Sequence, residues 1–318
     1  MSVSEDVQSI LKAEATRLGF DLVGICAAQP APHLDFYKRW IDRGNHAGME
    51  YLQRHESLKA TPENLLPGCR SIIAVGLNYK QAAPYEPGEP RIASYALGRD
   101  YHRILRARLK RLSAWMEAQV PGVQTRACVD SAPIFERDYA RLAGLGWFGK
   151  NTCLINSKRG SWFFIGLLLT TADLEPDIAA VGGCGTCRDC IDACPTGAII
   201  FEDGRWQVDS RSCISYLTIE HRGEFDAKLA KRIGSWTFGC DVCQDVCPFN
   251  HSRPNQPMRA ASSQDPDILQ SRKWPSLVEL ARLGEDDWDA LSSGSAIRRT
   301  GLEGIRRNAR ANLENLDA

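Results

Sequence analysis

The sequence predicts an α+β protein made of three parts. Helical and strand-like hydrophobic patterns alternate through residues 1–175, which predicts a mixed N-terminal domain of one and a half typical domain sizes. Cysteines become dense in residues 176–254 while apolar periodicity weakens, so we expect a small domain stabilised by metal rather than by a large core. Residues 255–318 open with a Pro-, Ser- and Gln-rich stretch and then regain helical spacing, which predicts a short helical tail.

Two long helices are expected in the N-terminal part. Residues 1–20 have an amphipathic pattern with Ser4 as N-cap, and residues 100–120 place apolar side chains at helical spacing between Arg and Lys. The apolar positions that we expect to face the core are Val7, Ile10, Leu11 and Leu18 in the first helix and Leu105, Leu109, Leu112 and Met116 in the second.

Strands are expected between and after these helices. Residues 21–28 and 71–79 read as short buried strands. Residues 153–156 and 161–170 flank the turn 157–160, which predicts a hairpin. This mixture is compatible with an α/β or an α+β arrangement of the N-terminal part.

Composition limits the classes of function. Hydrophobic residues make up 43% and charged residues 25% of the 318 residues, as in soluble globular proteins. Lys plus Arg number 39 and Asp plus Glu number 39, so bulk charge does not predict nucleic-acid binding, although a local basic patch is compatible with it. The N-terminus lacks a signal-peptide pattern, and the longest apolar run, 162–169, is too short to span a bilayer. We therefore expect a cytoplasmic monomer with no membrane contact and with its twelve cysteines reduced.

Two cysteine runs have the spacing of [4Fe–4S] ligands. Two-residue spacings let successive thiolates reach three corners of a cubane, and the cysteine before a proline ligates the other cluster. The first run has four such cysteines, whereas the second has three and needs a further ligand, for which Cys213 is the candidate. The runs are Cys184-Gly-Thr-Cys187-Arg-Asp-Cys190-Ile-Asp-Ala-Cys194-Pro195 and Cys240-Asp-Val-Cys243-Gln-Asp-Val-Cys247-Pro248.

Because the cysteine before each proline ligates the other cluster, each of two [4Fe–4S] clusters receives four thiolates. Zinc sites also use Cys-x-x-Cys, but they do not explain why Cys-x-x-x-Cys-Pro appears twice. Two clusters carry electrons without breaking bonds, so the large N-terminal part is expected to receive those electrons. The first cluster is assigned to Cys184, Cys187, Cys190 and Cys247, and the second to Cys194, Cys213, Cys240 and Cys243.

A glycine-rich segment in the N-terminal part contains Gly144-x-Gly146-x-x-Gly149. A dinucleotide-binding fingerprint must follow a strand and open a helix. Here the glycines follow a predicted helix, 134–142, and lead into the predicted hairpin, so we reject a Rossmann site. Glycines packed in this way let the backbone approach a flat or bulky cofactor.

Two segments of the N-terminal part have the residue types of a reactive site, one around Asp130 and one around Gly146, and a third, around His102, joins them in the resemblance below. One of them predicts a strand that runs into a helix with Pro near its first turn. The segments are Val129-Asp130-Ser-Ala-Pro133 with Glu136-Arg137, Ala143-Gly-x-Gly-Trp147-x-Gly-Lys150-Asn151, and Tyr95-Ala-x-Gly98-x-Asp100-Tyr101-His102.

Together with the double cysteine run in this order, these segments resemble the epoxyqueuosine reductase family, over roughly residues 5–250. The resemblance implies a nitroreductase-like, cobalamin-binding N-terminal domain (1–175), a ferredoxin-like domain (176–254) and a remnant of a HEAT-like helical tail (255–318). It also implies an oxidoreductase that converts epoxyqueuosine to queuosine at the wobble position of tRNA, removing the epoxide oxygen as water. Electrons from an external donor of the ferredoxin or flavodoxin type would pass through the clusters to cobalamin.

Asp130 matches the proton donor of that family. A group that protonates the departing oxygen must itself be protonated in the complex, so burial against the corrin is expected to raise the pKa of Asp130. The alternative role for Asp130 is a helix cap ahead of Pro133.

The resemblance implies base-off cobalamin without a histidine ligand to cobalt. Asp100-Tyr-His102 begins like the cobalamin signature Asp-x-His-x-x-Gly, but Leu105 stands at the glycine position. We therefore expect His102 to be structural or near the substrate. For each predicted corrin contact taken alone, a plain packing role is the alternative. These contacts are Arg54, Leu154, Ser157, Gly160, Ser215, Tyr216, Cys240 and Asp241.

The tail has an arginine-rich segment beside an apolar stripe of Ile305, Ala309 and Leu313. The arginines are candidate contacts to tRNA phosphates, and a solvated helix face is the alternative. Family members often carry a longer helical-repeat tail, so the resemblance leaves open how far the tail of this chain contacts tRNA. The candidates are Arg298, Arg299, Arg306, Arg307 and Arg310.

Two other functions compete with the tRNA-modifying reductase. A reductive dehalogenase-like enzyme acting on a small molecule is disfavoured because no twin-arginine signal is present. A non-catalytic electron carrier is disfavoured by the large N-terminal part. Four cysteines are not assigned to a cluster and are expected to be buried free thiols. They are Cys26, Cys69, Cys128 and Cys153.

Overall fold

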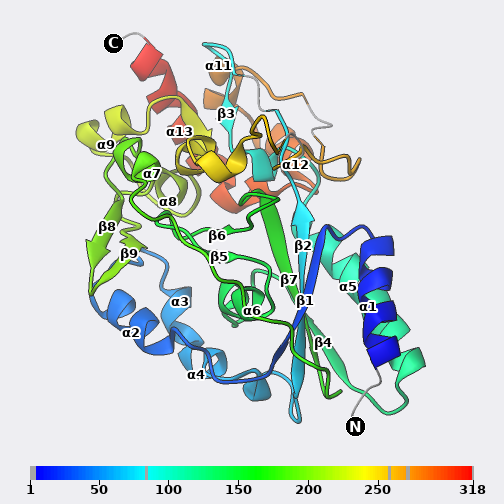
Figure 1. Ribbon diagram of the computed structural model, residues 1–318. Helices are drawn as coiled ribbons and strands as arrows, with labels where there is room; N and C mark the ends of the chain where they lie inside the picture. Colours follow the sequence, from blue (N-terminus) through cyan, green and yellow to red (C-terminus); the bar gives the residue numbers. More distant parts are fainter. Residues whose placement is uncertain (1–4, 83–84, 257–258, 270–272, 317–318) are drawn as a thin grey trace.

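A four-stranded sheet lies at the centre of the protein (Figure 1). The computed structural model describes residues 5–82, 85–256, 259–269 and 273–316, so the predicted N-cap Ser4 lies outside the described residues. Every pairing in this sheet is antiparallel, which confirms the α+β class and makes the α/β description of the N-terminal part wrong. The strands in sheet order are β1 (Leu22–Ala27), β2 (Ser71–Asn78), β7 (Phe163–Thr170) and β4 (Thr125–Cys128).

Helices cover both faces of this sheet. Strand β2, one of its two inner strands, is therefore buried along its whole length. Alternate residues of β2 enter two separate cores: Ile73 packs with α1 (Glu5–Arg17) and α5 (Tyr101–Gln119), whereas Ile72 packs with α6 (Glu136–Leu142). Figure 1 shows α1 and α5 together on one side of the strands and α6 on the other. The other short helices of this part are α2 (Leu34–Asp42), α3 (Tyr51–Arg54), α4 (Glu56–Lys59), η1 (Pro62–Asn64) and η2 (Ser94–Ala96).

The two predicted long helices are present. All four predicted core positions of α5 are buried, which confirms its orientation. In α1, Leu11 is buried at 1% exposure while Ile10 is 54% exposed, so the prediction for Ile10 is wrong. Leu11 and Ala15, four residues apart, take the core-facing positions of α1 and turn Ile10 outward.

The predicted hairpin around residues 157–160 forms only in part. A single bridge pairs Asn156 with Gly160, and the chain then enters β7, which pairs with β2 and β4 instead. The strand before the turn, β6 (Leu154–Ile155), pairs with β5 (Trp147–Phe148). The prediction failed because the long strand β7 finds two partners in the central sheet, which a local pattern does not reveal.

The cysteine-rich part consists of short elements joined by loops. Its strand β10 (Trp236–Phe238) pairs in parallel with β3 (Arg91–Ile92), which connects it to the N-terminal part. The remaining elements are α7 (Asp189–Asp192), β8 (Ile199–Glu202), β9 (Arg205–Val208), α8 (Ile214–Ile219), α9 (Ala227–Arg232), α10 (Val242–Asp245) and η3 (Pro248–Asn250).

The C-terminal segment packs against both preceding parts. Ile305 and Ala309 enter a core with Ile92 and Phe238, while Ile268 enters the core beneath α5. The predicted helical character is confirmed, whereas the domain boundaries near 175 and 254 stay predictions. None of the helices in the described ranges is long and apolar enough to cross a membrane. The elements are α11 (Leu277–Ala281), α12 (Glu285–Ser292), η4 (Ala296–Thr300) and α13 (Gly301–Leu316).

Candidate functional site

Asp130 lies on the turn between β4 and α6. Its φ is +47°, a left-handed conformation that Asp tolerates better than most residues. The preceding Val129 is buried, while the side chain of Asp130 is 58% exposed. Arg106 donates to the hydroxyl of Ser131 at 2.8 Å and holds the turn from α5. The turn therefore presents the carboxylate outward from a fixed base.

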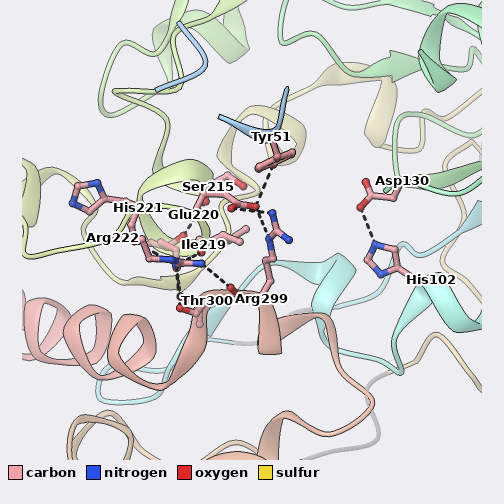
Figure 2. A network of polar contacts seen from close by, with 11 residues as sticks. Tyr51, His102, Asp130, Ser215, Ile219, Glu220, His221, Arg222, Arg299 and Thr300 are labelled. Atoms are coloured by element: carbon pink, nitrogen blue, oxygen red, sulfur yellow. Dashed lines mark hydrogen bonds and ion pairs between the residues drawn. The ribbon is translucent and has the colours of Figure 1, made fainter. Parts of the chain in front are cut away.

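His102 contacts Asp130 directly. Its Nε2 lies 2.8 Å from Asp130 Oδ2, and its Nδ1 lies 2.8 Å from Asp100 Oδ1 (Figure 2). Asp100 is also the N-cap of α5 and accepts a hydrogen bond from the backbone N–H of His102. The ring of Tyr101 stacks on the imidazole at 4.0 Å. We expected His102 to be structural or near the substrate, but we did not predict its contact with Asp130. This contact joins two elements that are separated in the sequence.

The carboxylates on both sides decide where the proton lies. Burial lowers the pKa of His102, but the hydrogen bonds to Asp100 and Asp130 outweigh burial and raise the pKa to about 9. Burial raises the pKa of Asp130, but the hydrogen bond and charge of His102 outweigh it and leave that pKa below its ordinary value. The upward shift predicted for Asp130 concerns the complex with the corrin and stays a prediction, whereas in the protein alone a cationic imidazole favours the carboxylate form. Since both ring nitrogens are engaged, His102 has none free to ligate cobalt.

A second carboxyl group lies next to Asp130. Burial, followed by the charge of Asp130, raises the pKa of Glu136 to about 8. Its Oε1 has no hydrogen-bond partner among the described residues. The N-cap of α6 is Phe135, without a side-chain hydrogen bond, so the alternative role of Asp130 as a helix cap is wrong. The site thus holds two carboxylates, Asp100 and Asp130, beside a cationic imidazole, and burial favours the neutral form of Glu136 next to them.

A polar network lies beside the Asp130–His102 pair in Figure 2. Arg299 donates from Nε to Glu220 Oε1 at 2.8 Å, and Tyr51 donates to the same oxygen at 3.5 Å. Burial raises the pKa of Tyr51, and the charges of Glu220 and, more weakly, Asp130 add to this rise. The network and Asp130 therefore share one electrostatic environment, although their residues lie far apart in the sequence.

The structure gathers the predicted cluster cysteines into two groups. Four thiols border one small cavity, those of Cys184, Cys187, Cys190 and Cys247. Burial raises the pKa of Cys240 to about 12, and Cys213 and Cys194 add to this rise, which places these thiols in a second group. Within the described ranges, no three His, Cys, Asp or Glu side chains converge closely enough to hold a single metal ion. The donor set of the first cavity, four thiols, fits an iron–sulfur cluster.

The predicted corrin contacts differ in accessibility. Leu154 is 3% exposed within the core, and any side chain at Gly160 would meet Asn250. Tyr216, on α8, accepts a hydrogen bond from the N–H of Gly48. Asp241 is 4% exposed and borders a cavity whose polar lining includes Lys80, Gln81, Arg91 and Ser94. Arg54 and Ser157 are exposed, while Ser215 and Cys240 are half-buried.

The glycines of the 143–152 segment have a different role from the predicted one. A Cβ on Gly146 would lie 2.4 Å from the carbonyl oxygen of Ile155, and one on Gly149 would lie 2.5 Å from the Ile155 side chain. These glycines therefore let two stretches of the chain approach each other.

The tail arginines all have partners within the chain. Arg307 is 5% exposed and donates to the carbonyls of Leu217, His221 and Gly223, so the prediction that it contacts tRNA is wrong. A pattern of arginines does not distinguish a buried guanidinium from an exposed one. The other four pair with Asp289 (Arg298), Glu220 (Arg299), Glu303 (Arg306) and Glu224 (Arg310).

The four cysteines that are not assigned to a cluster are free thiols. Cys26, Cys69 and Cys128 are buried as expected. Cys153 is less buried, and its thiol is hydrogen-bonded to that of Cys243. Cys153 therefore lies against Cys243, a predicted ligand of the second cluster. Its sequence context did not predict this position.

Comparison with known proteins places this site in a family. Residues 59–131 match the family model described as "Epoxyqueuosine reductase QueG, DUF1730", and residues 183–250 match "4Fe-4S double cluster binding domain". An epoxyqueuosine reductase of Synechococcus sp. (strain RCC307) is 41% identical over 96% of this chain and 93% of its own length. The chain belongs to the epoxyqueuosine reductase family. As a member of the epoxyqueuosine reductase family it is an oxidoreductase with a double [4Fe–4S] domain.

Other members of the epoxyqueuosine reductase family support this placement. The protein of Gloeobacter violaceus is 40% identical over 95% of this chain and 94% of its own. The solved structure of epoxyqueuosine reductase from Streptococcus thermophilus superposes with a TM-score of 0.85 at 28% identity, over 98% of this chain and 82% of that one. The Bacillus subtilis enzyme, solved with a catalytic aspartate loop swung out of its active site, has a TM-score of 0.83 at 27% identity, with the same coverage.

Proposed function

We propose that this chain reduces epoxyqueuosine to queuosine at the wobble position of tRNA, with Asp130 as the proton donor. The observation that carries the proposal is the Asp130–His102 contact on an outward-facing turn, in a member of the epoxyqueuosine reductase family. A solved member of this family contains a tRNA-Tyr stem loop modified with epoxyqueuosine. The exposed arginines Arg298, Arg299 and Arg310 are our candidates for phosphate contacts, and Arg306, which is less exposed, is a fourth.

The reaction consumes two electrons and two protons. The epoxide oxygen leaves as water, and a carbon–carbon double bond forms between the two carbons that carried it. Asp130 would deliver a proton from its carboxyl to the departing oxygen, because a neutral leaving group lowers the barrier to breaking the C–O bond. In the free protein the raised pKa of His102 favours its protonated form, whose Nε2 lies 2.8 Å from Asp130 Oδ2. Substrate that covers the carboxylate would remove it from water and favour transfer of this proton to Asp130.

We infer that base-off cobalamin binds beside this site. The fit is supported by the engagement of both His102 nitrogens and by the polar cavity next to Asp241. When bound, cobalamin supplies low-valent cobalt as the reductant of the epoxide carbon. Arg91 borders the cavity with a side chain of the kind that holds the phosphate of such a cofactor, while Lys80 and Gln81 donate to backbone carbonyls of the chain. The other proposed contacts are Arg54, Leu154, Ser157, Gly160, Ser215, Tyr216 and Cys240.

Electrons would enter from a small external carrier of the ferredoxin or flavodoxin type. The proposed ligands are Cys184, Cys187, Cys190 and Cys247 for the first cluster and Cys194, Cys213, Cys240 and Cys243 for the second. A solved catabolic reductive dehalogenase aligns with a TM-score of 0.48 at 19% identity, which is too low to support a dehalogenase function.

The test is turnover of tRNA bearing epoxyqueuosine by the anaerobically reconstituted chain. Mass spectrometry of the digested tRNA should show loss of one oxygen mass from the modified nucleoside. Asp130→Asn should keep both clusters and the corrin but lower kcat by roughly 10²–10⁴-fold, the usual contribution of a general acid. Asp173→Asn, which removes a charge from an exposed pair with Arg70, is the matched control and should keep wild-type turnover. Wild-type turnover in Asp130→Asn would refute the assignment of Asp130, and failure of the wild-type chain to take up a corrin would refute the proposed reaction.

A further inference from the structure

The turn at residues 149–153 contacts both cysteine loops. Lys150 Nζ donates to the carbonyl oxygen of Gly185 at 2.8 Å and to that of Cys187 at 2.7 Å. It also borders the cavity formed by the first group of cluster thiols. Lys150 therefore places an ammonium at the edge of the first cluster site, although it belongs to the N-terminal part of the chain.

The neighbouring residue of the same turn contacts the second loop. Asn151 is 4% exposed, and its Nδ2 donates to the carbonyl oxygen of Cys243 at 3.1 Å. Its Oδ1 accepts from the N–H of Cys153 at 3.2 Å, which fixes the side chain within the turn. The turn itself is constrained, because Thr152 has a φ of +63° and Gly149 has no room for a Cβ. A rigid turn thus positions Lys150 relative to both loops.

The charge of Lys150 is not neutralised by an acidic neighbour. The hydrogen bonds of its ammonium go to two neutral carbonyls, and no carboxylate of the described residues forms an ion pair with it. A [4Fe–4S] cluster with four thiolates is anionic, and each added electron makes it more so. A fixed cation at short range in a partly buried site stabilises the reduced form more than the oxidised form.

We propose that Lys150 is a positioning residue that raises the reduction potential of the cluster held by Cys184, Cys187, Cys190 and Cys247, and so favours the uptake of electrons there. The inference depends on the double-cluster domain, which the family model at residues 183–250 matches, and not on the identity of the substrate. Its failure and that of the proposed reaction can therefore be told apart.

The test is a potentiometric titration of the full, reconstituted chain, followed by electron paramagnetic resonance. Lys150→Gln keeps a hydrogen-bond donor for the loop carbonyls but removes the charge, while Lys150→Arg keeps both. In Lys150→Gln the reduced-to-oxidised ratio of the first cluster at a fixed potential should fall about tenfold, a shift of ~59 mV for a one-electron couple. The second cluster should titrate as in the wild type, and Cys184→Ser identifies which signal belongs to the first.

Lys228→Gln is the matched control, because Lys228 is exposed on α9 in the same cysteine-rich part of the chain. It should leave both titrations unchanged. If Lys150→Gln contains its full iron and its first cluster titrates as in the wild type, the proposal is overturned. If Lys150→Gln loses iron, Lys150→Arg decides: a first-cluster potential equal to that of the wild type supports the role of the charge, and a lowered potential overturns it.

Discussion

Two carboxylates flank the His102 ring at equal distances, and their combined charge holds a proton that an isolated histidine would release near neutral pH. The three groups are coupled, so their protons belong to the group as a whole. Glu136 adds a buried carboxyl with a pKa of about 8 next to them. Environments that push the pKa values of neighbouring groups apart are typical of sites that move protons.

Replacing His102 tests this coupling through pH. The pKa of His102 in the folded protein, about 9, lies above its value of ~6.5 in an unfolded chain. Its stabilising contribution is therefore fully present below pH ~6.5 and is lost as pH rises through about 9. His102→Gln should destabilise the protein more at pH 6 than at pH 10, as measured by urea unfolding across that range.

Turnover provides the second measurement for His102. Wild-type turnover should fall as pH rises through about 9, where His102 loses the proton that it passes to Asp130. This fall should be absent in His102→Gln, whose turnover is low throughout. The exposed His55 offers a control, since His55→Gln should reproduce both wild-type profiles. A destabilisation by His102→Gln that is the same at pH 6 and pH 10 would contradict the proposed coupling.

At the scale of elements, helix α5 carries both the core of the N-terminal part and the base of the site. Leu105 and Leu109 pack so closely on β7 that a Cβ at Gly166 would lie 3.0 Å from each. His102 stands on the first turn of the same helix. The position of the imidazole relative to Asp130 therefore depends on how tightly α5 packs against the sheet.

Leu109→Ala should destabilise the protein by ~2–5 kcal/mol, because it removes a fully buried side chain and leaves a cavity. Anaerobic denaturant unfolding of the reconstituted chain measures this loss. The adjacent, exposed Lys110 supplies the control, and Lys110→Ala should change stability by at most ~0.5 kcal/mol. Equal effects of the two substitutions would show that α5 does not carry the core in this way.

Across the whole molecule, helix α13 holds together two elements that lie next to cysteines proposed for the second cluster. Asn308 donates to the carbonyl oxygens of Thr218 at 2.7 Å and Thr237 at 2.9 Å. Thr218 belongs to α8, which directly follows Cys213, and Thr237 belongs to β10, which ends two residues before Cys240. The tail is thus an internal support for the cluster site as well as a candidate surface for tRNA.

Asn308→Ala should remove a donor from each of two buried carbonyls and lower stability by ~1–3 kcal/mol, mostly through Thr237, because the carbonyl of Thr218 keeps the hydroxyl of Thr300 as a donor. Because α8 and β10 lose a shared partner, we also expect the second cluster to release iron faster than the first. Iron analysis and paramagnetic resonance after dilution into chelator measure this difference. Arg310→Ala, which breaks an exposed ion pair on the same helix, should behave as the wild type. Equal iron loss from both clusters would contradict this role of α13.

Features that depend on local spacing follow from the sequence alone. The cysteine runs, the buried face of α5 and the buried strand β2 follow from residue type and period, because neighbouring residues alone impose those patterns. The family was also readable from short segments, since their glycines, acids and cysteines stand in a characteristic order.

Which distant segments meet depends on the three-dimensional fold. It pairs β7 with β2 rather than with its neighbour in sequence, buries Arg307 among carbonyls, and brings His102 to Asp130 from another element. Hydrogen bonds and charges act over a few ångströms in space, whatever the separation along the chain. The protonation state of Asp130, and the contact of Lys150 with the first cysteine loop, are therefore properties of the fold.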